Sequence, residues 1–565
     1  MNKKNNIVRL VIILLIILFV NIIGQYYHGY YDFTDDKRYS LTEPTQKLLS
    51  SQKDIIFVKV LLGGDLPSGF KRLQNSVKDI LSQFRAINPK IVYMFQNPME
   101  GGTVKQINKV KEDLRKEGIV PVNLFIGEGD SKTEKSIYPY AIFSFGKRVY
   151  VVNLLEAQAS GVPQEQTLNN SVALLEYKFA NAIQKLRMER KNNIVFIGDK
   201  GGLDDVHINT LFKDLSKYYY VAKMNIDSTH RIHKDIDLVI VARPTKKFSS
   251  KNQFVLDQYL MHGGNIIWLI DKVEASLDSI NKYGMYTPKL IETGLDDMFF
   301  KYGIRINPNL IQDIQCTRIP QQIGMNGGKP QIELFPWFYH LLVNSNSDHP
   351  VSNGISDIWM PFVSSIDTIE TFTDTKKTIL LTSSRTSRFQ LYPMRLTFQI
   401  MKYKPQIKNF NKPFLPISVL VGGNFESFFK NRLTSETKEM LKKIGDDFAE
   451  KSVKPGKMIF VGDGEFVQNL YNTKTNKPTP IGYNKWENFT FQGNKDFILN
   501  AVEYMMDDNG IVKARSKRVK LRLLDKGKLL KEKTKWQLIN IVFPLVLLAI
   551  FGLLFNFKRR RKYSK

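Results

Sequence analysis

The chain has 565 residues, of which 43% are hydrophobic and 24% are charged, with a formal net charge of +28. This length predicts several domains with substantial cores and excludes a small scaffold held together by disulfides. Cys316 is the single cysteine, which excludes an internal disulfide bond and a thiolate metal site.

Two apolar runs near the ends of the chain have the length of membrane-spanning helices. Residues 7–24 are mainly Ile, Leu and Val, and residues 538–557 form a second run of similar length. Because residues 25–28 lack the small-residue pattern of a cleavage site, we expect residues 1–24 to be an uncleaved signal anchor. The sequence thus predicts a two-span membrane protein.

Basic residues that flank the spans predict the orientation. Residues 3, 4 and 9 are basic and precede the first span, so we expect a cytoplasmic N-terminus. Two spans place both ends on one side, and residues 25–537 then lie on the periplasmic side of a bacterial inner membrane. The two ends contribute +9 and residues 513–535 another +9, which leaves +10 for the rest. A basic segment beside a membrane favours anionic headgroups or a protein partner over nucleic acid, and no nucleic-acid-binding motif accompanies it.

The first extracytoplasmic domain is predicted over residues 25–168. Short apolar strands and two amphipathic helices follow in the order β-α-β-α-β-β, which looks like a thioredoxin-type layout. Since no paired cysteine is present, we expect a scaffold without redox chemistry. Residues 169–191 are predicted to form a helix that links this domain to the next one. The predicted strands are 55–62, 91–95, 122–126, 140–145 and 148–154.

A second, larger domain is predicted over residues 192–510. Apolar strands alternate with single helices, which predicts a parallel sheet covered on both faces. Residues 316–350 interrupt this rhythm with prolines, glycines and clustered aromatic residues, and we expect a long loop there. A basic juxtamembrane stalk, 511–537, leads into the second span at 538–557 and a basic cytoplasmic tail at 558–565. The predicted strands are 194–197, 218–224, 238–241, 265–270, 379–382, 417–421 and 458–461.

Glycine-rich turns follow two of these strands, at residues 198–202 and 462–464. Neither turn matches G-x-G-x-x-G or G-x-x-x-x-G-K-[ST], so no phosphate cradle and no cofactor are specified. Open α/β sheets nevertheless bind ligands at the carboxyl ends of their strands. Asp199 and Asp463 therefore mark a candidate ligand cleft.

Catalytic and metal-binding patterns are weak in this sequence. Cys316 has no glycine elbow around it, and no G-x-S-x-G motif occurs. His230 and His233 form an H-x-x-H pair without a third ligand, which favours ordinary surface histidines over a zinc site. No ATPase motif is present, so any energy must come from a partner. These patterns favour a non-enzymatic protein.

Two segments are candidate contacts with a protein partner. An aromatic cluster within residues 316–350 either anchors an interface or fills a core of the protein itself. The basic segment 513–535 before the second span would lie on the extracytoplasmic side, whereas the positive-inside rule predicts basic residues on the cytoplasmic side. This departure indicates a docking element. The candidate residues are Phe335, Trp337, Phe338 and Tyr339 in the aromatic cluster, and Lys531, Lys533, Lys535 and Trp536 in the stalk.

Several segments resemble the GldG family of gliding-motility-associated ABC-transporter auxiliary, or substrate-binding, proteins. The resemblance covers essentially the whole chain, although its motifs have no catalytic meaning. The segments are DFTDDKRYSLT at 32–42, DLVIVARPTKKFS at 237–249, HGGNIIWLID at 262–271, HPVSNGI at 349–355, GDGEFVQN at 462–469 and KTKWQLIN at 533–540.

The resemblance implies an inner-membrane subunit that works with a separate permease and a separate ATPase and supports surface gliding. It also implies that the larger domain is similar to glutamine-amidotransferase-like domains without their catalytic Cys and His, which also occur in intraflagellar-transport proteins. We therefore expect a subunit that couples the permease and ATPase to an envelope partner or substrate. The alternatives are a receptor for an envelope sugar or peptide and a membrane-tethered hydrolase.

Overall fold

The computed structural model divides the chain into two compact units, Met1–Arg518 and Val519–Lys565. The predicted first span is described only at residues 8 and 11–19, which are helical and exposed. The described residues are 8, 11–19, 40–126, 133–156, 164–188, 191–344, 347–371, 373–402, 404–443, 448–472, 475–507, 509–516 and 526–563.

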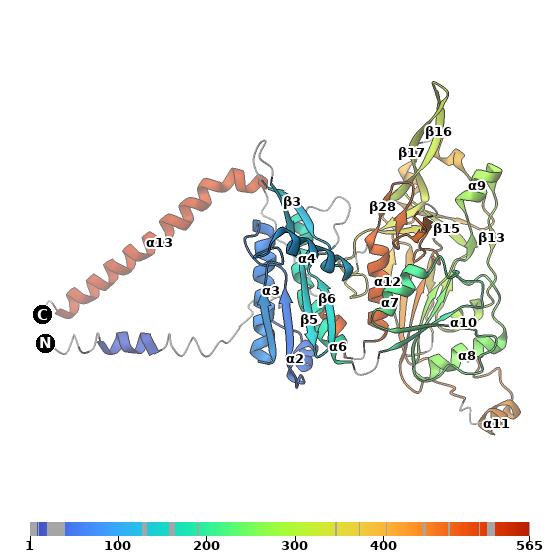
Figure 1. Cartoon of the computed structure of the whole chain (residues 1–565), viewed down its shortest axis with the longest axis horizontal. Helices are drawn as coiled ribbons and strands as arrows, with labels where there is room; N and C mark the ends of the chain where they lie inside the picture. Colours follow the sequence, from blue (N-terminus) through green and yellow to red (C-terminus); the bar gives the residue numbers. More distant parts are fainter. Residues whose placement is uncertain are drawn as a thin grey trace. The chain divides into compact units, whose positions relative to one another are not determined.

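The first domain is built on a four-stranded sheet in the order β2-β1-β5-β6 (Figure 1). β1 and β2 are parallel, whereas β5 runs antiparallel to both β1 and β6. Helix α3 covers this sheet with a buried apolar face that includes Leu73, Val77 and Phe84. The elements are α2 (Glu43–Ser50), β1 (Ile56–Val60), α3 (Ser68–Ile87), β2 (Ile91–Phe95), α4 (Val104–Lys116), β5 (Tyr140–Phe145) and β6 (Arg148–Asn153).

The third predicted strand of this domain lies outside the main sheet. It forms β3 (Val122–Ile126) and pairs in a separate two-stranded sheet with β4 (Thr133–Ile137), a strand that the sequence analysis did not predict. The predicted strand order is therefore incomplete, because β4 is polar and lacks the apolar run that identifies a buried strand. The thioredoxin-like assignment stays a prediction.

The predicted linking helix is two helices, α5 (Gln164–Ala173) and α6 (Leu175–Arg187). The apolar face of α6 belongs to the core of the first domain, where Phe179 and Ile183 are fully buried. The ring of Phe179 lies 5.2 Å from that of Phe143 in β5, measured between centroids. Helix α6 is therefore packed as part of the first domain.

The second domain is built on a seven-stranded sheet in the order β20-β23-β24-β10-β9-β7-β8. The five strands from β24 to β8 are parallel, as predicted. β23 runs antiparallel to both β24 and β20, so the prediction of an all-parallel sheet is wrong at this edge. A short apolar strand has the same sequence pattern in either direction. The strands are β7 (Asn193–Ile197), β8 (Tyr220–Met224), β9 (Ile236–Ala242), β10 (Asn265–Leu269), β20 (Thr375–Thr382), β23 (Pro416–Gly423) and β24 (Gly456–Val461).

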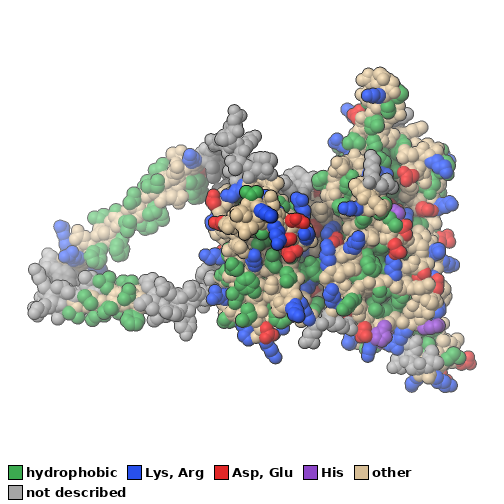
Figure 2. Space-filling model, viewed as in Figure 1, with side chains coloured by type: hydrophobic (Ala, Val, Ile, Leu, Met, Phe, Trp, Pro, Cys, Tyr) green, Lys and Arg blue, Asp and Glu red, His purple; other side chains and the backbone are tan. Residues whose placement is uncertain are grey.

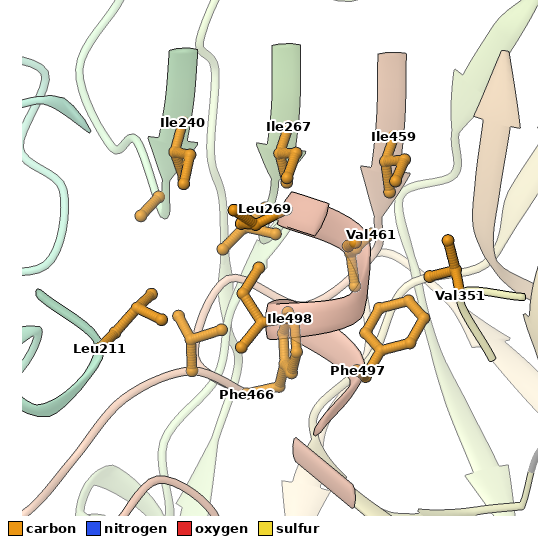
Figure 3. Packing of buried hydrophobic residues seen from close by; sticks show 14 of the residues in the cluster. Leu211, Ile240, Ile267, Leu269, Val351, Ile459, Val461, Phe466, Phe497 and Ile498 are labelled. Atoms are coloured by element: carbon orange, nitrogen blue, oxygen red, sulfur yellow. The ribbon is translucent and has the colours of Figure 1, made fainter. Parts of the chain in front are cut away.

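Both faces of the large sheet are covered, because successive side chains of a strand point to opposite faces. Figure 3 shows Ile240, Ile267 and Ile459 on three neighbouring strands, on the side of Phe497 and Ile498 from α12 (Gln492–Met505). Helix α7 (Asn209–Ser216) contributes to the same core. The opposite face packs on α8 (Ser250–Met261) and α10 (Asp296–Lys301).

Residues 316–350 form strands where the sequence analysis expected a loop. β16 (Cys316–Asn326) and β17 (Lys329–Val343) make a hairpin, and β17 pairs at its end with β18 (Ile358–Pro361). Figure 1 shows the hairpin projecting from the rest of the second domain. A two-stranded ribbon tolerates proline because its outer edges need no backbone donor. This tolerance explains why the prolines misled the prediction.

The second unit is described as the single helix α13 (Lys526–Tyr563), with Pro544 inside it. Within the described residues it is the one helix long and apolar enough to cross a membrane, over Glu532–Arg561, and none of that stretch is buried. Figure 2 shows hydrophobic side chains exposed along it. The predicted second span, 538–557, lies inside this helix, which indicates membrane association.

Candidate functional site

Four charged side chains meet at the carboxyl edge of the large sheet. Arg243 directly follows β9, Asp271 follows β10, and Asp463 and Glu465 follow β24. Because these three strands are parallel neighbours, their carboxyl ends share one edge. This is the edge at which open α/β sheets bind ligands.

Arg243 joins the cluster through two carboxylates. Its Nε donates to Asp271 Oδ2 at 2.9 Å, and its Nη2 lies 2.7 Å from Glu465 Oε1. Asp271 is buried and also accepts a hydrogen bond from the backbone N–H of Gly464 at 2.5 Å. Arg243 has a φ of 54°, a left-handed conformation that is costly for a residue with a Cβ. The surrounding packing holds this residue in a strained position.

Three carboxyl groups share a single cation in this cluster. Burial raises the pKa of Asp271, and the Arg243 guanidinium opposes that rise. Burial, together with the charges of Asp271 and Glu465, raises the pKa of Asp463 well above its usual range. Burial and Asp271 raise the pKa of Glu465 to about 7, against Arg243. Burial thus raises the pKa of all three carboxyl groups, and they titrate as a coupled set.

Close backbone approach explains the glycines of the turn after β24. A Cβ on Gly462 would lie 2.1 Å from the backbone oxygen of Ser364, and one on Gly464 would lie 2.8 Å from the Cβ of Arg243. Asp463 Oδ1 accepts backbone N–H groups from Glu465 at 2.7 Å and Phe466 at 2.9 Å. The glycines of this turn thus allow the strand ends to pack closely.

A pocket of about 160 Å³ adjoins Glu465 at this edge. Its walls come from the segment after β10, the loop after β24, the β17–β18 pair and residues 483–486. Aromatic side chains dominate one part of the lining, and charged or amide side chains the other. The lining residues are Ala275, Ser276, Leu277, Asp278, His340, Trp359, Pro361, Phe362, Glu465, Gln468, Leu470, Tyr483, Lys485 and Trp486.

The two predicted cleft residues do not meet. Asp463 belongs to the cluster described above, whereas Asp199 accepts the backbone N–H groups of Ile226 at 3.1 Å and Asp227 at 3.0 Å in the turn after β8. β7 and β24 are separated by β9 and β10, which is about 14 Å at about 4.8 Å per strand. Asp199 therefore stabilises a neighbouring turn, and a cleft shared by both residues is not formed.

The sequence analysis did not assign roles to Arg243, Asp271 or Glu465. Each lies one to four residues after a predicted buried strand, and this position was the available signal. Which strand ends are neighbours depends on the order of strands in the sheet. That order was not predicted, so the three residues could not be placed together.

The aromatic cluster divides between core and surface. Trp337, Phe338 and Tyr339 are buried, and the rings of Trp337 and Tyr339 lie 5.2 Å apart. Phe335 is half-buried. These contacts favour the alternative that the aromatic residues fill the protein's own core. The exposed apolar side chains of the hairpin are instead Ile323, Met325, Ile332 and Leu334.

The candidate nucleophile and histidine pair form no catalytic arrangement within the described residues. Burial raises the pKa of Cys316 to about 12, so the thiol remains protonated at neutral pH. His230 and His233 are exposed, and His233 Nδ1 lies 3.2 Å from Asp235 Oδ2. Across the part of the chain that the structure describes, no group of three or more His, Cys, Asp or Glu residues could hold a metal ion.

The candidate docking residues of the stalk lie on α13. Lys533, Lys535 and Trp536 are exposed, and Trp536 Nε1 donates to Glu532 Oε2 at 3.0 Å. Lys531 is in the same helix, but its side chain lies outside the described residues. Residues two apart in a helix point about 200° away from each other, so Lys533 and Lys535 do not share a face.

The start of the predicted stalk is packed on the first unit. Residues 511–516 form the 3₁₀ helix η3 (Ile511–Ser516), in which Ile511, Val512 and Ala514 are buried against Tyr177 and Ala180 of α6. The described N-terminal end of the same unit reaches the same helix, since the backbone N–H of Thr42 donates to Glu176 Oε1 at 2.6 Å. Leu48 of α2 joins the η3 cluster. Both ends of residues 40–516, which we call the body, therefore meet at α6.

Glu503 links the two domains through buried polar contacts. Its carboxylate accepts hydrogen bonds from Lys185 and Tyr177 of α6, and from Asn181 Nδ2 at 3.2 Å. Burial opposes the charged form of Lys185, but Glu503 outweighs it and holds the pKa of Lys185 well above its usual range. Burial likewise opposes ionisation of Glu503, yet Lys185 lowers the pKa of Glu503. Both groups are therefore charged at neutral pH.

Comparisons with known proteins cover nearly the whole chain. Residues 191–501, more than half of the chain, match the family model described as an ABC-type uncharacterized transport system. Residues 35–144 match a domain of unknown function. A protein of Borreliella burgdorferi that is described as an uncharacterized protein is 23% identical over 578 residues, which cover 99% of each chain.

Among solved structures, the mmIFT52 N-terminal domain matches 56% of this chain and 98% of that domain. Its sequence identity is 13% and its TM-score is 0.32. A score this low supports no conclusion about the fold or the function of the chain.

Proposed function

The chain belongs to the family described as an ABC-type uncharacterized transport system, and from this premise we propose that it is a non-enzymatic membrane subunit of such a system. The family match and the C-terminal helix support association with transporter components and with a membrane. The sequence contains no ATPase motif, so the proposed subunit depends on another protein for energy.

The observation that carries this proposal is the meeting of both ends of the body at α6. Thr42 and the η3 segment are attached to one helix, and the same helix holds the second domain through Glu503. A displacement of the membrane segments would therefore act on α6 first and reach the second domain through buried contacts. This arrangement suits a subunit that transmits movement from a membrane partner.

The detailed proposal has the topology that the sequence predicts. Residues 1–24 and 538–557 span the bacterial inner membrane, both ends are cytoplasmic, and the body is periplasmic. The membrane segments dock on a permease that works with a separate ATPase. The body couples these proteins to an envelope partner or substrate in support of gliding motility, as the family resemblance implies.

Co-purification tests this function. The full chain carrying an affinity tag is extracted in mild detergent, and the recovered proteins are identified by mass spectrometry. We expect a polytopic permease and an ATPase at amounts comparable to the tagged chain. A matched control replaces residues 538–557 by an unrelated apolar helix of equal length, which retains membrane attachment and should lose the permease. Recovery of the chain alone would contradict the proposal.

A periplasmic receptor for a small ligand is the second candidate function. The pocket beside Glu465 favours it, because concave sites with aromatic walls and a few polar groups are typical of ligand binding. The two functions are compatible, since a coupling subunit can also carry a ligand site.

A further inference from the structure

The pocket beside Glu465 has the size of a single small ring. Its volume of about 160 Å³ is close to the roughly 150 Å³ of a cavity that holds benzene, and below the roughly 300 Å³ at which drug-sized sites begin. It lies at the carboxyl edge of the parallel strands, where Asp271 and Glu465 follow β10 and β24. Size and position together predict a site for one small molecule.

Two residues that line this pocket each carry a covered ring nitrogen without a partner. His340 Nδ1 and Trp359 Nε1 are buried and have no hydrogen-bond partner among the described residues. Burial lowers the pKa of His340 to about 3, so its ring is neutral at ordinary pH and carries one donor and one acceptor. A buried polar atom without a partner is costly. Both nitrogens are covered by the wall itself, so a ligand would gain these hydrogen bonds only if the wall side chains move.

Two further polar side chains of the pocket can exchange hydrogen bonds with a ligand. Glu465 is fixed at the wall because Arg243 Nη2 holds its Oε1 at 2.7 Å, and the Glu465 side chain remains 27% exposed. Gln468 carries an amide that both donates and accepts. The pocket therefore offers hydrogen-bond donors and acceptors on more than one wall, without a cluster of basic residues.

Strained backbone occurs on both sides of the same site. Arg243 and Phe362 each have a φ of 54°, although neither is a glycine or an asparagine. Such conformations persist only where the surrounding structure enforces them, and they concentrate at binding and catalytic sites. Arg243 positions Glu465, and Phe362 lines the pocket.

The charges in the pocket disfavour an ionic ligand. Lys485 is the one lysine or arginine among the described lining residues, which also include Asp278 and Glu465, so an anionic phosphate or nucleotide finds no basic cluster. The Nζ of Lys485 lies 4.3 Å from the centroid of the Trp486 ring, so a cation already occupies that aromatic face. The preferred ligand is neutral, with one apolar face and several hydroxyl groups.

We propose that this pocket binds a single saccharide unit. A sugar ring presents C–H groups on its faces and hydroxyl groups around its rim, which matches aromatic walls combined with carboxylate, amide and ring-nitrogen groups. Trp359 and Tyr483, which are half-buried, contact the ring faces, while Glu465 and Gln468 bind the hydroxyl groups. This inference is independent of the proposed transporter partnership, because binding is a property of the isolated chain.

Saturation-transfer NMR on the full chain tests the proposal. The protein is kept in a detergent without a sugar headgroup, such as an amine oxide, and glucose and N-acetylglucosamine are the probes, with glycine amide and methyl phosphate as comparison compounds. We expect saturation of the ring protons of at least one sugar, and none of the comparison compounds. Gln468→Ala should weaken sugar affinity about fivefold to tenfold, the effect of one lost hydrogen bond.

Exposed residues of the β16–β17 hairpin supply the matched controls. Gln331→Ala and Glu333→Gln change the same residue types outside the pocket, and both should bind sugar as the unchanged chain does. Glu465→Gln keeps the shape of the side chain and should also weaken binding. The proposal is overturned if neither sugar binds at about 10 mM, if Gln468→Ala and Gln331→Ala bind equally, or if only a comparison compound depends on Gln468.

Discussion

Single residues determine the electrostatics of two buried sites, at Arg243 and at Glu503. Each site contains one buried or half-buried cation. The number of carboxyl groups that this cation must neutralise differs between the two sites. Lys185 and Glu503 form a matched pair that stays charged. Arg243 cannot neutralise three carboxyl groups, so some of them hold protons.

Replacing Glu465 by Gln should alter the pH dependence of stability. The pKa of Glu465 is about 7 in the folded chain against 4.5 ordinarily, so the folded state binds more protons between these values. The free energy of unfolding contributed by this group is therefore fully present below about pH 4.5 and declines as pH rises towards 7. Glu465→Gln should reduce this decline, measured by denaturant titration at several pH values in that window. Glu333→Gln should leave the decline unchanged, and an equal effect of both variants would refute the assignment.

Breaking the buried pair between the domains should be costly. Glu503→Gln leaves Lys185 without its counter-ion, and the Lys185 side chain is only 9% exposed. Such a loss costs about 3–5 kcal/mol of unfolding free energy. The control Glu112→Gln removes an exposed pair with Lys116 and should cost about 0.5 kcal/mol or less. Chemical denaturation of the two variants measures both losses of unfolding free energy. Equal losses would show that the Lys185–Glu503 pair stabilises the protein no more than an exposed ion pair does.

The elements that could be predicted are those with a periodic apolar pattern. The strands at residues 194–197 and 265–270 occur close to their predicted positions, because burial on both faces dictates their apolar residues. The reversed direction of β23 and the extra strand β4 could not be predicted, since neither direction nor pairing partner is encoded locally. The β16–β17 hairpin was hidden by its prolines.

The base of the β16–β17 hairpin should behave as core. Trp337 is fully buried in β17, so Trp337→Ala should lower the unfolding free energy by about 3–5 kcal/mol. Met325, near the tip, is 65% exposed, so Met325→Ala should change the unfolding free energy by about 0.5 kcal/mol or less. Thermal unfolding of both variants gives the comparison. A small effect at Trp337 would return the cluster to the partner-contact interpretation.

At the scale of the whole molecule, different signals in the sequence predict the membrane segments and the location of the body. Apolar length predicted the C-terminal helix, whereas the charges that flank the two predicted spans led us to expect an extracytoplasmic body. The meeting of Thr42 and η3 at α6 could not be predicted, because these segments are far apart along the chain and contain no paired motif. The site at the carboxyl edge was foreseen only through Asp463.

The basic lead into α13 should contribute to partner binding. Lys531, Lys533 and Lys535 form a basic collar within α13. Lys533 and Lys535 are two residues apart and point about 200° away from each other, so the collar can meet anionic groups on more than one side. Replacing all three by Gln should reduce recovery of a co-purified permease and ATPase, and this reduction should be smaller at high salt, which screens the same charges in the unchanged chain. Replacing Lys408, Lys412 and Lys404 in the second domain provides a control of equal charge change. If the unchanged chain and both variants recover equal amounts of the permease and ATPase, the collar is only a linker.

Photo-crosslinking in living cells tests the membership of a transporter complex most directly. A photoreactive amino acid replaces Trp536 on α13, and a second variant carries it at Tyr283, an exposed position of the second domain. We predict that position 536 crosslinks to a polytopic permease, while position 283 does not. Crosslinks from position 536 to lipid alone, with no protein product, would contradict the account.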